Sequence, residues 1–142
     1  LRPGGVPRAA VEALLGQPLA APDATRPRAS GTLASHYAPR ARVRLFDDAP
    51  ALRAALAAAA APGTDPGAPP LHRLAVYSRS LSSAPGAAAF HPMPGRAEAA
   101  AHELFAVLRA LDASGVAEIW VERPPPDPDW DAVADRLRRA AA

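Results

Sequence analysis

The sequence predicts a small three-layer α/β domain with a mainly parallel sheet, preceded by an extended linker. From Arg42 onward, short apolar runs of strand length alternate with helical patterns, an order typical of parallel strands joined by right-handed crossovers. Between Pro18 and Pro39, four prolines and a lack of apolar periodicity indicate a linker. We therefore divide the chain into residues 1–17, 18–40 and 41–142.

The composition limits the core and excludes several chemistries. Of the 142 residues 49% are hydrophobic, but 38 are alanine, so the large apolar side chains can fill one modest core and not two. The absence of cysteine excludes disulfides, thiolate metal ligands and thiol nucleophiles. No apolar run approaches the roughly 20 residues of a membrane helix, so we expect a soluble protein with no membrane partner.

Charge is divided unevenly along the chain. The net charge is +5 up to Arg44 and −3 beyond it, which makes the first part the candidate for contact with anions. A nucleic-acid surface is disfavoured there, because Tyr37 is the only aromatic residue before Phe46 that could stack on bases. The start at Leu1 has neither an initiator Met nor a signal-peptide pattern, so we expect the chain to be part of a longer protein.

The elements of the first half follow from periodicity and capping residues. Apolar residues on one side predict a short helix over Val6–Leu15. After the linker, Val43 and Leu45 alternate with arginines, which indicates a strand. Asp48 can cap a helix that runs from about Pro50 to Ala61.

The second half alternates apolar runs with amphipathic stretches. Leu74–Tyr77 is uniformly apolar, as expected of a buried parallel strand, and a further short strand is predicted at Ala87–His91. Arg96–Ala113 repeats apolar residues at helical spacing and predicts the longest helix. Glu118–Val121 is another apolar strand, and the acids of Asp127–Asp129 are expected to cap a last helix. The large side chains expected in the core include Leu104, Trp120 and Trp130.

The usual metal and phosphate motifs are incomplete. The Rossmann-like outline has no Gly-x-Gly-x-x-Gly after a strand, so it does not predict a dinucleotide site. His102 and Glu103 resemble the opening of a zinc-binding helix, but Ala106 stands where the second His is required. Asp127–Asp131 has calcium-loop spacing, but Ala132 occupies the position of the turn glycine. We therefore expect no metal site, and capping explains these acids.

One polar loop lies where ligands often bind in parallel sheets. The segment Ser78–Ser83 follows a predicted strand, and Arg123–Asp127 follows another, so both are expected at the carboxyl edge of the sheet. A plain polar loop is the favoured interpretation. The alternative is a non-catalytic module that binds a small anionic ligand at this edge.

The linker carries a more specific signal. Its run from Ser30 to Pro39, SGTLASHYAP, closely resembles the interdomain linker of two-domain threonylcarbamoyl-AMP synthases, where a Ser/Pro-Gly pair precedes His-Tyr-Ala-Pro. Leu1–Gly4 is similar to the last strand of that family's YrdC-like catalytic domain, and Val6–Gly16 to the helix that closes it. The segments 101–115, 117–122 and 130–137 resemble the end of the family's small α/β domain, although Asp129 and Asp131 stand where glycine is more common.

The resemblance implies a cytoplasmic nucleotidyltransferase that joins L-threonine, bicarbonate and ATP, with magnesium, into threonylcarbamoyl-AMP. This product serves the threonylcarbamoyladenosine modification of tRNA, and no stable tRNA binding by this chain is expected. Residues 1–17 would be the tail end of the YrdC-like domain, 18–40 the interdomain linker and 41–142 the C-terminal α/β domain. The upstream YrdC-like domain is the implied partner. Without that domain this chain is expected to be inactive and to hold no catalytic residue, cofactor or metal.

The resemblance also implies site residues for ATP. Arg2 of Leu-Arg-Pro-Gly would contact ATP, and Tyr37 would close over the nucleotide, with Ser30, Gly31 and His36 as further residues of this lid loop. A guanidinium can hold phosphate oxygens through two parallel hydrogen bonds. Other interpretations leave Tyr37 to dock the linker on one domain, Arg2 as a surface charge, or the α/β domain as a packing or dimerisation unit.

Overall fold

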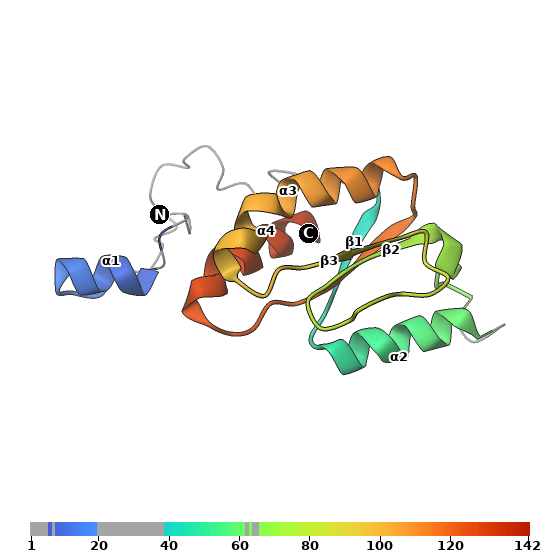
Figure 1. Ribbon diagram of the computed structural model, residues 1–142, viewed down its shortest axis with the longest axis horizontal. Coiled ribbons are helices and arrows are strands. Elements are labelled where there is room, and N and C mark those ends of the chain that lie inside the picture. Colours follow the sequence, from blue (N-terminus) through green and yellow to red (C-terminus); the bar gives the residue numbers. More distant parts are fainter. Residues whose placement is uncertain (1–5, 7, 20–38, 62, 64–65) are drawn as a thin grey trace.

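The protein forms a three-layer α/β fold around a parallel sheet, as the sequence predicts (Figure 1). The computed structural model describes residues 6, 8–19, 39–61, 63 and 66–142. Within these residues, four strands form the sheet in the order β1-β4-β2-β3, and every neighbouring pair is parallel. The strands are β1 (Arg42–Phe46), β2 (Leu74–Ser78), β3 (Ala89–Pro92) and β4 (Glu118–Glu122).

Helices cover both faces of the sheet. In Figure 1, α2 (Ala49–Ala60) lies on one face, and α3 (Ala97–Ala113) and α4 (Asp131–Ala140) lie on the other. Short 3-10 turns, η1 (Leu71–Arg73) and η2 (Pro128–Trp130), precede β2 and α4. No described helix is long and apolar enough to cross a membrane.

The central strands are the most buried part of the molecule. β4 lies between β1 and β2, so that Ile119 is aligned with Val43 on one side and Ala75 on the other. All five residues of β2 are buried, which explains why its sequence lacks alternation. The short strand predicted at Ala87–His91 is present as β3, shifted to Ala89–Pro92.

Two apolar clusters flank the sheet. The α2-side cluster contains the buried residues Phe46, Leu52, Leu74, Val76, Leu81 and Trp120. The α3/α4-side cluster is larger and includes Val43, Tyr77, Leu104, Leu108, Ile119, Trp130, Val133 and Leu137. The core positions predicted for Leu104, Trp120 and Trp130 are therefore confirmed.

Local capping sets where the helices begin and end. The Asp48 carboxylate accepts the N–H of Ala51 at 2.8 Å and starts α2. Gly115, with φ +76°, follows the end of α3, a conformation that favours glycine. The last helix begins later than the sequence suggests, at Asp131, because Asp127 caps the 3-10 turn η2 through the N–H of Asp129.

The helix predicted over Val6–Leu15 is present as α1 (Arg8–Leu15). None of its residues is buried, and Leu14 is 89% exposed. Arg8 donates to Glu12 across one turn at 2.8 Å, and Glu12 also accepts the N–H of Leu19 at 2.8 Å. These contacts stabilise α1 locally.

Candidate functional site

The carboxyl ends of the strands meet at one edge of the sheet, as parallel pairing requires. Ser78 ends β2 and Glu122 ends the neighbouring strand β4. Residues 79–88 connect β2 to β3 without a helix. This edge therefore places the serine-rich loop beside an acidic residue that comes more than forty residues later in the chain.

Glu122 is the centre of the polar network at this edge, and it is only 3% exposed. Its Oε2 accepts the Ser78 hydroxyl at 2.5 Å, the Arg79 N–H at 3.1 Å and the Ser80 N–H at 2.9 Å. Its Oε1 accepts the Ser80 hydroxyl at 2.6 Å. The Arg79 guanidinium lies 3.9 Å from the same oxygen. The carboxylate thus anchors the start of the 79–88 loop.

The electrostatics of Glu122 follow from these contacts. Burial alone would raise the pKa of its carboxyl, because a charge is costly away from water. The hydrogen bonds from Ser78 and Ser80, with the charge of Arg79, outweigh burial and lower the pKa below its usual range. Glu122 is therefore ionised at neutral pH. It already accepts the hydroxyls of Ser78 and Ser80 and the N–H groups of Arg79 and Ser80.

A second ion pair lies at the same edge. Arg123 Nη1 is 3.3 Å from Asp47 Oδ1, and the N–H of Arg123 donates to the carbonyl of Phe46 at 2.9 Å. The side chains are 51% and 83% exposed, so this pair is well solvated. It joins the ends of β1 and β4, at the point where the following segments depart to opposite faces of the sheet.

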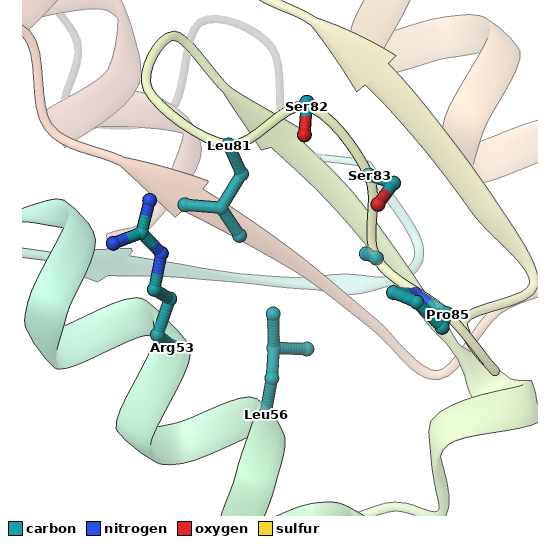
Figure 2. Close-up of a pocket in the computed structure, with 7 residues that line it drawn as sticks. Arg53, Leu56, Leu81, Ser82, Ser83 and Pro85 are labelled. Carbon is teal, nitrogen blue, oxygen red and sulfur yellow. The ribbon is translucent and has the colours of Figure 1, made fainter.

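A pocket of about 240 Å³ opens beside this edge, between α2 and the loop. Arg53 and Leu56 line it from α2, and residues 81–85 line it from the loop. Figure 2 shows the hydroxyls of Ser82 and Ser83 directed from the loop toward the side where Leu56 lies. The pocket combines a cation, two hydroxyls and apolar walls.

The site residues implied by the linker resemblance lie outside the described part of the chain. This applies to Arg2, Ser30, Gly31, His36 and Tyr37, so their roles stay predictions. The serine-loop residues of the alternative anion site, Ser78–Ser83, are described by the structure, and their polar groups fall into two sets. Ser78, Arg79 and Ser80 contact Glu122, whereas Ser82 and Ser83 line the pocket.

Two residues of this region were not identified from the sequence. Glu122 ends an apolar run, and an acid at the end of a buried strand next to a serine-rich loop was an available signal. Arg53 had no comparable signal, because it lies on an alanine-rich helix. Its proximity to Ser82 and Ser83 depends on how α2 packs on the sheet.

Glu103, which was considered as a metal ligand, has other contacts. Glu103 Oε1 accepts the Tyr77 hydroxyl at 3.1 Å and lies 3.3 Å from His91 Nε2. Burial, followed by the charge and hydrogen bond of Glu103, raises the pKa of Tyr77 above its usual range. Among the described residues, no group of three or more His, Asp or Glu could hold a metal ion.

Comparisons with known proteins agree with this architecture. The sequence model of the family described as "Threonylcarbamoyl-AMP synthase, C-terminal domain" matches residues 6–142. The fold is similar to a crystal structure of P. abyssi Sua5 complexed with L-threonine, with a TM-score of 0.76 and 23% identity over 99% of this chain. A structure of P. abyssi Sua5 with two substitutions gives a TM-score of 0.70 and 24% identity, again over 99% of this chain.

This chain covers a smaller part of each solved structure than of itself. This chain corresponds to 41% of the first P. abyssi structure and 40% of the second. A comparison with curated proteins found no match. The family match extends over nearly the whole chain, well beyond the linker motif. The chain therefore belongs to the threonylcarbamoyl-AMP synthase C-terminal domain family.

Proposed function

We propose that this chain is the linker and C-terminal domain of an L-threonylcarbamoyladenylate synthase, a cytoplasmic nucleotidyltransferase of tRNA modification. The whole enzyme would join L-threonine, bicarbonate and ATP into threonylcarbamoyl-AMP. The observation that carries this proposal is the family match over residues 6–142, which includes the SGTLASHYAP run. The chain spans about two fifths of the solved structures, so the chemistry would reside largely in the upstream YrdC-like domain.

A supporting role for the α/β domain agrees with its polar edge. Glu122 is satisfied by hydrogen bonds from the serine loop, and Arg123 pairs with Asp47. Such groups hold structure and are not poised to transfer protons to a substrate. The enzyme would require magnesium with ATP, but no cluster in the described residues fits that ion, so we assign it no ligand here.

The linker would act as a lid over the nucleotide. Tyr37 would close on bound ATP, with Ser30, Gly31 and His36 in the same loop, and Arg2 would hold phosphate oxygens. Closure would exclude water from a mixed anhydride that hydrolyses easily. The second P. abyssi structure carries its substitutions at a consecutive histidine and tyrosine, the same residue pair as in this motif.

Kinetics of the full-length enzyme test the lid. Tyr37→Ala should lower pyrophosphate release or ATP affinity roughly five- to 150-fold, by analogy with the loss of one base-stacking contact. Tyr37→Phe should lie near the wild type if the ring, not the hydroxyl, makes the contact. Thermal melting of both variants should be unchanged. Wild-type kinetics for Tyr37→Ala would leave the linker as a tether only.

The alternative function, an independent anion-binding module at the sheet edge, needs free donors. Ser78, Ser80 and the N–H of Arg79 already donate to Glu122, an anion of the chain itself. This occupation favours the supporting role over a ligand bound at Ser78–Ser80 beside Glu122. Titration of the chain alone with ATP separates the two, because a module binds by itself and a lid without its partner domain does not.

A further inference from the structure

The pocket between α2 and the serine loop has features that the supporting role does not require. Arg53 and Leu56 are three residues apart on α2, so both side chains project from one side of the helix toward the loop. Leu52, beside them, is fully buried and fixes α2 against the sheet. The helical wall of the pocket is therefore held in place by the core.

The loop wall is equally well held. At its start, Ser78 and Ser80 bond to Glu122, and the Ser78 hydroxyl also accepts the N–H of Leu81 at 3.1 Å. At its end, Ala87 donates to the carbonyl of Ala84 at 3.1 Å. Leu81 itself is only 7% exposed. The hydroxyls of Ser82 and Ser83 thus lie on a preorganised segment, which lowers the entropic cost of binding.

Arg53 differs from the two arginines at the neighbouring edge. Arg79 lies next to Glu122, and Arg123 is paired with Asp47. Arg53, Ser82 and Ser83 are exposed, and within the described residues the Arg53 guanidinium and the two serine hydroxyls make no ion pair or hydrogen bond. The pocket therefore holds a cation and two hydroxyl donors with no internal anion.

Size and lining define the class of ligand. A volume of about 240 Å³ is below the range of roughly 300 to 1,000 Å³ that is usual for drug-sized ligands. The walls of Leu56, Leu81 and Pro85 suit a short apolar stem. A guanidinium matches the planar geometry of a carboxylate through two parallel hydrogen bonds.

We propose that this pocket binds a small organic carboxylate, with Arg53 and the hydroxyls of Ser82 and Ser83 holding the carboxylate and Leu56 and Leu81 contacting its stem. The inference concerns the α/β domain alone and does not depend on the lid role of the linker. Two observations carry it. The Arg53 guanidinium and the hydroxyls of Ser82 and Ser83 line the pocket without a partner in the described residues, and hydrogen bonds hold the loop that forms one wall.

A titration of the ¹⁵N-labelled chain, followed by amide chemical shifts, tests the proposal. Isobutyrate is the probe, isobutyramide is its neutral analogue, and inorganic phosphate is the competing anion. Isobutyrate should shift the amides of Arg53 and of residues 81–84 saturably, and isobutyramide at equal concentration should not. Phosphate should bind more weakly because it has no apolar stem. Absence of a saturable isobutyrate shift, or equal shifts with isobutyramide, would overturn the proposal.

Matched variants locate the binding. Arg53→Gln should weaken isobutyrate binding about tenfold or more, as expected for loss of a charge-assisted hydrogen bond, and the Ser82→Ala, Ser83→Ala double variant should weaken it several-fold. Arg138→Gln removes an exposed charge on α4, across the sheet, and should leave binding unchanged. Wild-type affinity of Arg53→Gln, or tighter binding of phosphate than of isobutyrate, would contradict the assignment.

Discussion

The two faces of the sheet are covered to different extents. Two helices, α3 and α4, cover one face over a large apolar cluster, whereas α2 alone covers the other over a smaller one. On the α2 side, Phe46 and Trp120 pack with ring centroids 5.0 Å apart, and the Arg44 guanidinium lies over both rings. The same side holds the pocket at Arg53. This pocket thus lies on the face of the sheet that is covered by one helix.

The largest expected effects come from one core residue on each face. Leu104, fully buried on the α3/α4 side, and Trp120, 1% exposed on the α2 side, should each cost about 2 to 5 kcal/mol of unfolding free energy when replaced by alanine. Chemical denaturation of the two variants measures this cost. A loss below about 0.5 kcal/mol for Trp120→Ala would show that the α2 face contributes little to stability.

Next in size is the effect of removing the Glu122 carboxylate. Glu122→Ala leaves two serine hydroxyls and two backbone N–H groups without their acceptor, so we expect a loss of about 2 to 4 kcal/mol. Denaturant melts at neutral pH measure this loss. Amide exchange should also quicken at Ser80 and Leu81, while α3 stays protected. Equally faster amide exchange on both faces of the sheet would mean that the 79–88 loop does not open independently of the rest of the domain.

The same carboxylate should give stability a dependence on pH. Its pKa is lowered in the folded protein, so its contribution is fully present above the unfolded value, about 4.3, and is lost as the pH falls through the folded value. Glu122→Gln should lack this part of the acid-induced loss. Melting temperatures from pH 7 to pH 3 for both proteins provide the measurement, and parallel curves would exclude Glu122 as the source.

A smaller effect is expected from Arg44 on the α2 side. Its guanidinium lies 5.0 Å from the centroid of Phe46 and 5.7 Å from that of Trp120, at the edge strand of the sheet. Arg44→Ala should cost about 0.5 to 1 kcal/mol through the lost cation–π contact and uncovered rings. Tryptophan fluorescence should report greater solvent contact in this variant, and an unchanged spectrum would contradict the covering role.

The smallest effect is expected at the exposed pair of Arg123 and Asp47. Arg123→Ala should change stability by about 0.5 kcal/mol or less, because both side chains are well solvated. Added salt should weaken even this contribution. A loss above about 1 kcal/mol in denaturant melts would show that the pair fixes the ends of β1 and β4.

Local patterns in the sequence were sufficient for most of the fold. The uniformly apolar run at Leu74–Tyr77 predicted a strand buried on both faces, and the helical spacing over Arg96–Ala113 predicted α3. The start of the last helix was placed too early, because Asp127 caps a 3-10 turn and not the helix itself. Membership of the synthase family was also evident from the linker motif, and the family match confirms it.

The sequence by itself determined most of the elements, the parallel pairing of the strands and the family, because periodicity, caps and motifs act within a few residues of one another. Only the tertiary structure decided which polar groups meet. Glu122 binds Ser78 and Ser80 across more than forty residues because β4 inserts beside β2. Arg53 and Ser82 line the same pocket only because α2 packs on that face, and such an arrangement depends on packing that no local pattern encodes.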